Sequence, residues 1–329
     1  MSSKSKKIIV TGGAGFIGSA IVWRLNELGE DNILIVDRLD ETDKWRNLVP
    51  LRFVDYIDAD DLLRDRAVFN DTRAIIHLGA CSSTTERDSA YLMRNNYQYT
   101  WDLSEIALAN HVRFIYASSA ATYGDGSAGM ADGTDDLNAL RPLNMYGYSK
   151  HLFDQFAARK GLFDQIVGLK YFNVFGPNED HKGDMRSLVN KAFTQIRETG
   201  KLQLFKSHHP DYQNGQFGRD FVYVKDAVEI TLHFLERDGG GLFNVGAGKM
   251  HTWNELAAAI FSALDKESNI EYVDMPEHLR DRYQYHTEAD ISRIRDAGYE
   301  NQITPLIDAV ADYVQNYLVP GKHLGDDRD

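Results

Sequence analysis

A glycine-rich turn near the start of the chain constrains the fold more than any other feature. The β-branched run Ile8–Val10 leads into Thr11-Gly-Gly-Ala-Gly-Phe-Ile-Gly18, and helical periodicity follows over Ser19–Leu28. In such a turn one glycine allows the tight bend, another lets the backbone approach a pyrophosphate, and the last lets the helix pack closely on the strand. The helix start then presents free N–H groups and a positive dipole end to the phosphates. The predicted dinucleotide contacts in this turn are Gly12, Gly15, Phe16, Ile17 and Gly18.

An acidic residue stands where the ribose of such a dinucleotide is expected. Asp37 follows the second β-branched run, Ile33–Val36, about 20 residues after Gly18. A carboxylate in this place hydrogen-bonds the ribose hydroxyls and favours NAD, because it repels a 2′-phosphate. Arg38 and Lys44 lie close by and can hold that phosphate instead. We therefore expect NADP as the cofactor, and NAD stays open.

Strand and helix patterns alternate through the first half of the chain. Buried-strand patterns recur at Ala74–His77, Phe114–Ala117 and Val167–Tyr171, with amphipathic segments such as Tyr91–Asn110 and Tyr146–Arg159 between them. Repeated strand–helix–strand units build a parallel sheet with right-handed crossovers. We predict an α/β fold with a doubly wound, Rossmann-type parallel sheet.

The pattern changes near residue 173. Shorter strands, among them Phe221–Val224 and Leu242–Val245, mix with helices, and Thr252-Trp-Asn-Glu255 has the signature of a capping box. We predict a dinucleotide-binding domain over 1–172 and a smaller, mixed α/β substrate lobe over 173–329. A segment near 221–246 is expected to return to the Rossmann sheet.

A tyrosine and a lysine four residues apart indicate proton chemistry. In Tyr146-Gly-Tyr-Ser-Lys150 the spacing places Tyr146 and Lys150 on one helix face, and Ala117-Ser-Ser-Ala-Ala-Thr-Tyr-Gly124 brings hydroxyl groups to the ligand edge of the sheet. Such a spacing alone is more often structural, but here it follows a dinucleotide turn. Lowering a tyrosine pKa from ~10 to ~7 takes roughly 4 kcal/mol, which one cation about 4 Å away supplies. We expect Tyr146 to be a base that Lys150 tunes.

Composition excludes several classes of partner. The net charge of −13 argues against nucleic acid, and no apolar run approaches the length of a membrane span. Cys81 is the one cysteine in the sequence and cannot form an internal disulfide, so we expect a cytoplasmic protein. His208 and His209 near Asp211 lack the spacing of a metal site, and we expect no metal.

Taken in order, the motifs resemble those of the extended short-chain dehydrogenase/reductases. The glycine turn, Ser119, Tyr146 and Lys150 follow one another as in that family. Arg219-Asp-Phe-Val-Tyr-Val224 and Phe243-Asn-Val-Gly-Ala-Gly248 are similar to signatures of its nucleotide-sugar members. The resemblance covers nearly the whole chain and implies an NAD(P)-dependent enzyme that acts on a nucleotide-linked sugar.

Four longer segments resemble one branch of this family, the ADP-heptose 6-epimerases. They are Gly79-Ala-Cys-Ser-Ser-Thr-Thr-Glu86, Asn95-Asn-Tyr-Gln-Tyr99, Tyr171-Phe-Asn-Val-Phe-Gly-Pro177 and His181-Lys-Gly-Asp-Met185. In that branch, which serves bacterial lipopolysaccharide synthesis, C6 of ADP-D-glycero-D-manno-heptose is oxidised with bound NADP. The ketone is then reduced from its other face, which gives the L-glycero product. The resemblance implies this substrate and reaction, and a homo-oligomer, often a pentamer.

The resemblance also assigns roles to residues of this chain. It implies that Tyr146 and Lys182 are the two acid/base groups, that Lys150 tunes Tyr146 and anchors the nicotinamide ribose, and that Ser119 holds the reacting oxygen. Without the resemblance, Lys182 is a lysine in a polar loop and is expected on the solvated surface. The further cofactor contacts that it implies are Leu78, Gly79, Ala80, Cys81, Ser82, Asn95 and Val174. The substrate contacts that it implies are Ser119, Asn173, Asp184, Lys191, Phe205, Arg219 and Tyr283.

Two other kinds of function stay open at this point. The first is another nucleotide-sugar epimerase or a dehydratase on the same fold. A dehydratase carries an Asp-Glu pair after the serine, where this chain has Ala120-Ala121-Thr122. The second is a non-catalytic NAD(P)-binding protein, in which the tyrosine or the lysine is commonly lost, whereas this chain keeps both.

Overall fold

A parallel sheet forms the larger part of the molecule. The computed structural model describes residues 6–134, 137–280 and 283–327. Within these ranges one sheet has seven strands in the order β10-β6-β5-β4-β1-β2-β3, and all of its neighbouring pairs are parallel. Its strands are β1 (Lys7–Thr11), β2 (Ile33–Asp37), β3 (Asp55–Asp58), β4 (Thr72–His77), β5 (Arg113–Ser119), β6 (Val167–Tyr171) and β10 (Gly241–Val245). The predicted α/β, doubly wound fold is confirmed.

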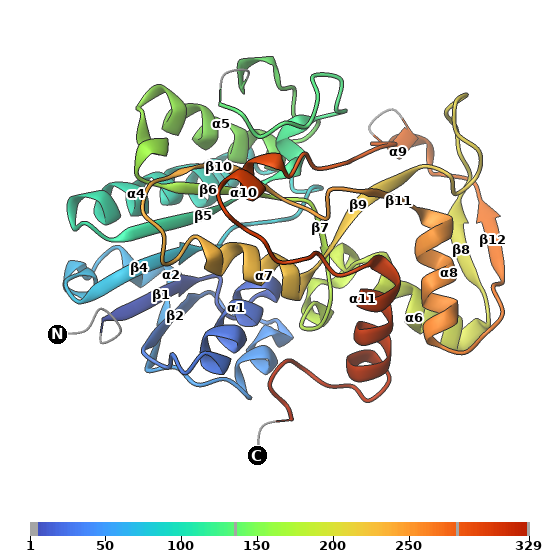
Figure 1. Cartoon of the computed structure of the whole chain (residues 1–329), viewed down its shortest axis with the longest axis horizontal. Helices are drawn as coiled ribbons and strands as arrows, with labels where there is room; N and C mark the ends of the chain where they lie inside the picture. Colours follow the sequence, from blue (N-terminus) through green and yellow to red (C-terminus); the bar gives the residue numbers. More distant parts are fainter. Residues whose placement is uncertain (1–5, 135–136, 281–282, 328–329) are drawn as a thin grey trace.

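Helices cover both faces of this sheet because its strands are apolar on both sides. In β1, Ile8 and Val10 pack toward the layer of α1 (Phe16–Glu27) and α7 (Val224–His233), whereas Ile9 packs toward the other layer. That second layer contains α4 (Tyr99–Ala109) and α5 (Met145–Arg159). Figure 1 shows the sheet between the two layers. The chain order reverses between β1 and β4, which is where such sheets bind ligands.

The C-terminal lobe lies beside the carboxyl ends of these strands (Figure 1). It contains a mixed sheet in the order β11-β9-β7 and a parallel pair of β12 and β8. The predicted capping box is confirmed, since Thr252 and Glu255 bond each other's backbone N–H groups at the start of α8. The strands of the lobe are β7 (Asn173–Phe175), β8 (Leu202–Phe205), β9 (Gly218–Tyr223), β11 (Met250–Thr252) and β12 (Ile270–Val273). The helices not yet named are α2 (Ala59–Leu62), α3 (Ser89–Leu92), α6 (Leu188–Thr199), α8 (Trp253–Ala263), α9 (Glu277–Arg280), α10 (Ser292–Asp296) and α11 (Leu306–Tyr313).

The structure differs from the predicted elements in three places. The helix expected over Tyr91–Asn110 is divided, because a π-helical segment, Met93–Gln98, separates α3 from α4. The strand expected at Phe221–Val224 ends one residue earlier, and Val224 begins α7. Of the segment near 221–246, β10 joins the large sheet but β9 lies in the small mixed sheet. The division into domains at 172/173 stays a prediction.

A buried ion pair ties α5 to the strands beneath it. Lys170 on β6 and Asp154 on α5 are both fully buried, and their Nζ and Oδ2 atoms are 3.1 Å apart. Asp154 also accepts hydrogen bonds from the Tyr116 hydroxyl at 2.7 Å and the Ser118 hydroxyl at 2.7 Å, while Lys170 donates to Thr122 at 2.6 Å. Each charge is therefore paired and hydrogen-bonded, as a buried charge must be. Because α5 carries Tyr146 and Lys150, this network fixes the helix that presents them.

Removing one partner of this pair should destabilise the whole fold. We expect Lys170→Met to lower the free energy of unfolding by about 3–5 kcal/mol, because Asp154 is left as an unpaired buried charge. Denaturant unfolding of the two proteins measures the difference. Lys160→Met, at an exposed position just after the same helix, is the control and should stay within about 0.5 kcal/mol of the wild type. A loss below about 1 kcal/mol for Lys170→Met would contradict the structural role of the pair.

Candidate active site

A cavity of about 880 Å³ opens at the carboxyl ends of the parallel strands. The glycine turn, the segment after β4, the start of α5 and the loop after β7 line it from the side of the large sheet, and Phe205 and Tyr283 line it from the lobe. A smaller hollow of about 100 Å³ adjoins it beyond Asp37. Both hollows are lined by Gly12, Asp37, Lys44, Gly79 and Ala80. The two together have the place of a dinucleotide site next to a substrate site, at the carboxyl ends of the strands.

The glycine turn forms the floor of this site. Gly12 has a φ of +69°, and a Cβ there would lie 2.7 Å from the backbone nitrogen of Gly79. A Cβ on Gly18 would lie 2.0 Å from the carbonyl oxygen of Gly12. The turn is thus a close-fitting cradle that side chains would fill, and α1 begins above it without a side-chain cap on its first N–H groups. These features fit a dinucleotide pyrophosphate at the helix start.

The adenosine end of the site contains the predicted acid and both predicted cations. Asp37 accepts a hydrogen bond from the backbone N–H of Ala14 at 2.9 Å and pairs with Lys44 at 2.8 Å. Arg38 lines only the smaller hollow, where it contacts Asp60 at 2.5 Å and the side-chain oxygen of Asn95 at 2.5 Å. The hydrogen bond that Arg38 donates to Asp60 raises the pKa of Arg38 above its ordinary value. Each cation is therefore already next to a carboxylate.

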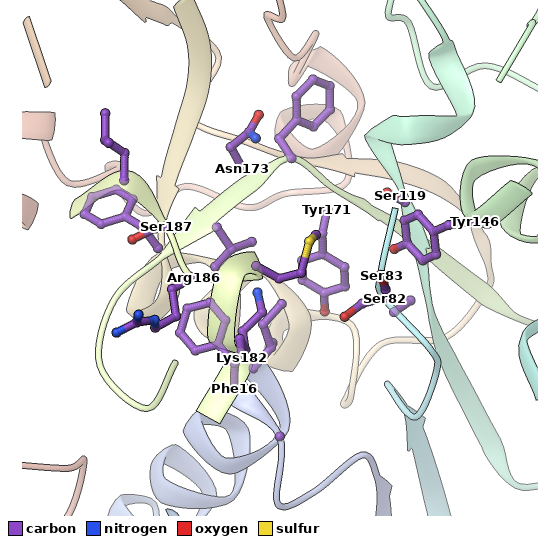
Figure 2. Close-up of a pocket in the computed structure, with 18 of the residues that line it drawn as sticks. Phe16, Ser82, Ser83, Ser119, Tyr146, Tyr171, Asn173, Lys182, Arg186 and Ser187 are labelled. Carbon is purple, nitrogen blue, oxygen red and sulfur yellow. The ribbon is translucent and has the colours of Figure 1, made fainter. Parts of the chain in front are cut away.

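Tyr146 and Ser119 meet at the edge of the large sheet. Asn144 caps α5 by accepting the backbone N–H of Gly147 at 2.8 Å, which places Tyr146 in the first helical turn. Figure 2 shows Tyr146 and Ser119 side by side on one wall of the cavity. Burial raises the pKa of Tyr146 above its ordinary value, and a hydrogen bond with Ser119 opposes this rise.

Lys150 lies on the same helix as Tyr146 and lines the same cavity. Its ammonium donates to the carbonyl oxygen of Ala117 at 2.8 Å, and no ion pair or hydrogen bond to Tyr146 is found among the described residues. Burial lowers the pKa of Lys150 to about 8, although the nearby Asp154 carboxylate raises it. Burial is the largest influence on the pKa of Tyr146 in this structure. The role of Lys150 in tuning Tyr146 stays a prediction.

Lys182 lies on another wall of the same cavity. It belongs to the short helical segment Asp180–Met185, and its Nζ lies 5.1 Å from the centre of the Phe16 ring. Figure 2 shows Lys182 and Tyr146 entering from different sides, with Tyr171 between them. Burial lowers the pKa of Lys182, and the negative charge of Glu179 raises it. The expectation from the residues alone, a solvated surface lysine, was wrong.

The residues predicted to contact substrate divide into two groups. Asn173, Lys191, Phe205 and Tyr283 line the cavity, as does the predicted cofactor contact Val174. Two further residues, Asp184 and Arg219, do not line it. Asp184 is exposed, since it follows Gly183 (φ +54°) at the outer side of its turn.

Arg219 is a buried cation behind the cavity wall. It is 8% exposed, and its guanidinium lies over the ring of Tyr283 at 5.1 Å and that of Trp253 at 5.8 Å. Burial lowers its pKa, and no carboxylate in the described part of the chain forms an ion pair with it. Both rings line the cavity, so a small movement of either ring would expose the guanidinium to an anionic ligand.

Sequence reasoning missed two residues that shape the site. Asn96 is fully buried and bonds the backbone of Cys81 twice, at 2.9 and 3.0 Å, and the Ser149 hydroxyl at 3.1 Å. It therefore fixes the cofactor segment against α5, and the neighbouring Asn95 in the same motif was its one signal. Trp253 lines the cavity at the start of α8, a position that the capping box at Thr252 indicated.

Several other groups have structural places. His77 is buried between the hydroxyl groups of Thr11 (2.6 Å) and Thr100 (2.9 Å), and burial lowers its pKa to about 3. His209 and Asp211 form an exposed contact of 3.7 Å. Among the described residues, no group of three or more His, Cys, Asp or Glu side chains has the arrangement of a metal site. No helix there is both long and apolar enough to cross a membrane.

The cradle at the glycine turn leads to a prediction. We expect Gly18→Ala to lose at least about tenfold in dinucleotide affinity, because the added Cβ forces α1 away from Gly12. Calorimetric titration of cofactor-free protein measures the affinity. Gly133→Ala is the control, since a Cβ at Gly133 meets nothing within 4 Å. Unchanged affinity in Gly18→Ala would show that the pyrophosphate lies elsewhere.

Comparison with known proteins places the chain among nucleotide-sugar enzymes. Residues 8–246 match the model of the NAD dependent epimerase/dehydratase family. An ADP-L-glycero-D-manno-heptose-6-epimerase of Nitratidesulfovibrio vulgaris is 54% identical over 94% of this chain and 97% of its own length. The enzyme of that name from Fusobacterium nucleatum is 46% identical over 94% of this chain and 98% of its own length.

The fold agrees with these sequence matches. The crystal structure of the Helicobacter pylori ADP-L-glycero-D-manno-heptose-6-epimerase superposes with a TM-score of 0.80 at 26% identity, over 96% of this chain and 97% of that one. The family match covers well over half of the chain, and the identity to the first relative extends over almost all of it. The chain belongs to the NAD-dependent epimerase/dehydratase family.

Proposed function

We infer that this chain interconverts ADP-D-glycero-D-manno-heptose and ADP-L-glycero-D-manno-heptose at C6. Two supports carry this conclusion: the identity to 6-epimerases along almost the whole chain, and the placement of Tyr146 and Lys182 on different walls of one cavity. Inversion of a carbon that bears a hydroxyl group, by oxidation and re-reduction, requires the ketone to turn its other face to the hydride donor. Acid/base groups on two walls suit this course, because each can serve one orientation of the oxygen.

The positions of the residues in the cavity support the following roles. Tyr146 removes the proton of the C6 hydroxyl, and Ser119 holds the oxygen by a hydrogen bond. When bound, a nicotinamide dinucleotide would accept the hydride from C6 and later return it. Once the ketone has turned, Lys182 supplies the proton to its oxygen. The sugar loses and regains one hydride and one proton, so the cycle is redox-neutral. Tyr146 then releases a proton to solvent and Lys182 takes one up before the next turnover.

The catalytic assignment predicts a large loss of turnover. We expect Tyr146→Phe and Lys182→Met each to lose at least ~100-fold in rate, because each removes the acid/base group for one orientation of the oxygen. The assay incubates purified protein with ADP-D-glycero-D-manno-heptose without added cofactor and resolves the C6 diastereomers, with UDP-galactose tested alongside. Tyr148→Phe is the matched control, because Tyr148 is 44% exposed and does not line the cavity.

Two outcomes would count against this assignment. Wild-type rates from Lys182→Met would remove that residue from the reaction. Epimerisation of UDP-galactose alone would move the enzyme to a different substrate. A dehydratase is disfavoured because Thr122, after Ser119, is buried and bonded to Lys170, and neither Ala120 nor Ala121 can act as an acid.

We propose NADP as the cofactor, held at its adenosine end by Arg38 and Lys44. Both cations line the smaller hollow beside Asp37, where a 2′-phosphate would replace carboxylates as their partner. We expect Arg38→Ala to weaken NADP binding about tenfold and NAD binding less, since a charge-assisted bond contributes roughly 1.5–3 kcal/mol. Arg64→Ala, in an exposed pair with Asp61, is the control. A tenfold preference of the wild type for NAD would overturn the proposal.

The remaining expectations stay predictions. The homo-oligomeric state, including the pentamer, is to be measured by light scattering. The cytoplasmic location is also untested.

A further inference from the structure

A fully buried carboxylate lies three residues before Lys182. Glu179 is 0% exposed and accepts hydrogen bonds from the backbone N–H of Ser187 at 2.6 Å and from its hydroxyl at 2.6 Å. A longer contact of 3.5 Å joins it to the backbone N–H of Gly176. Gly176 and Ser187 lie on either side of the segment that contains Lys182. One side chain thus ties together both ends of the turn that carries the lysine.

The same turn is anchored to two other parts of the molecule. Asn190 donates to Asp180 at 2.7 Å and contacts the hydroxyl of Tyr313 on α11 at 2.9 Å. Tyr313 is 1% exposed and also hydrogen-bonds Glu179. These contacts hold the turn, and among its described residues Glu179 is the buried carboxyl group. Burial raises the pKa of Glu179, and the hydrogen bonds from Ser187 and the charge of Lys182 oppose this rise and favour the carboxylate. A buried charge is costly unless it is compensated, so its presence needs a reason.

The reason lies in the surroundings of Lys182. The lysine ammonium faces the Phe16 ring on α1, and burial favours its neutral form. Across the cavity, burial raises the pKa of Tyr146 and Lys150 is a second basic group, so neither provides a fixed negative charge for the ammonium of Lys182. Of the charges in the described part of the chain, that of Glu179 is the one with a resolved effect on Lys182, and it favours the protonated form.

The remaining neighbours do not replace this carboxylate. Burial lowers the pKa of His181 to about 4, so this residue is neutral near pH 7. On the side of β2, Asp37 is paired with Lys44 at 2.8 Å. Asp180 is bonded to Asn190. None of these groups forms a contact with the ammonium of Lys182.

Resting on the proposed function, in which Lys182 is an acid/base group, we propose that Glu179 is the positioning residue for Lys182. Its buried carboxylate fixes the turn that carries the lysine and supplies the negative charge that keeps the ammonium protonated in the cavity. A proton donor that is neutral before the ketone forms could not complete the reduction. The carboxylate therefore sets the pH range in which the second half of the reaction proceeds.

The test is a titration of Lys182 in the full-length protein. The rate at which acetic anhydride acetylates Lys182, followed by peptide mass spectrometry as a function of pH, gives the midpoint without any need for turnover. Removing a negative charge next to an ammonium group favours the neutral amine. In Glu179→Gln we therefore expect the midpoint to fall by about one pH unit. The limb of the kcat–pH profile that reports Lys182 should shift by the same amount.

Two further variants separate charge from structure. Asn190→Ala loosens the same turn without removing the charge, and its midpoint should equal that of the wild type. Glu179→Asp keeps the charge but withdraws it by one methylene, so its midpoint should fall by less than in Glu179→Gln. This variant decides the question if Glu179→Gln does not fold.

The outcomes that overturn the proposal are specific. An unchanged midpoint in Glu179→Gln, or in Glu179→Asp if only that variant folds, contradicts it. A fall in Asn190→Ala as large as in Glu179→Gln does the same, because loosening would then be sufficient. Wild-type turnover by Lys182→Met would remove the proposed role of the lysine, while the acetylation midpoints would still report whether Glu179 controls its charge.

Discussion

Burial of the acid/base groups is the constraint on which the site depends. It raises the pKa of Tyr146 and lowers the pKa values of Lys150 and Lys182, so that each group is pushed toward its neutral form. In such surroundings a single nearby charge or hydrogen bond has a large effect. The chain supplies few of them: Ser119 for Tyr146, Asp154 behind Lys150, and a buried glutamate behind Lys182. In the proposed mechanism, proton transfer in this cavity therefore depends on residues one layer behind those that line it.

The fold assigns the two catalytic walls to different parts of the chain. Ser119 lies at the carboxyl end of β5 and Tyr146 at the start of α5, whereas Lys182 lies in the turn that follows β7. The cavity between them is cationic although the chain carries a net charge of −13. Of its described lining residues only Asp37 is acidic, while the basic ones include Lys44, Lys150, Lys182, Arg186 and Lys191. This local charge matches ligands that each carry a diphosphate group.

The sequence predicted those parts of the fold whose signal is local. Strands buried on both faces, such as β1 and β6, stand out as apolar runs, and the glycine turn and the capping box specify backbone geometry directly. The edge strand β3 was not predicted, because its Asp-Tyr-Ile-Asp sequence is only partly buried and has no apolar run. The π-helical segment Met93–Gln98 was predicted as part of one continuous helix, because the sequence pattern gave no sign of its change in backbone hydrogen bonding.

Features of the site that depend on tertiary contacts were harder to predict. Lys182 lies in a polar loop by sequence, and its burial depends on contacts with α1 and on a turn closed by Glu179. The spacing of Tyr146 and Lys150 placed both on one helix face, but the carbonyl oxygen of Ala117, on a strand, binds the ammonium. Asp184 was expected in the substrate site by its place in a motif, and the left-handed Gly183 turns it outward. In each case the position of the side chain depends on a contact with a residue distant in sequence or on a single backbone angle.

The central claim is that the hydrogen at C6 leaves as a hydride and returns as the same hydride to the opposite face. The most direct test is to carry the interconversion to equilibrium in D2O and to examine C6 of the product by mass spectrometry and NMR. The account predicts that C6 of the L-glycero product carries no deuterium, because only the hydroxyl proton passes through Tyr146 and Lys182 and exchanges with solvent. Deuterium at C6 would contradict it, since the inversion would then proceed by removal of a proton from carbon.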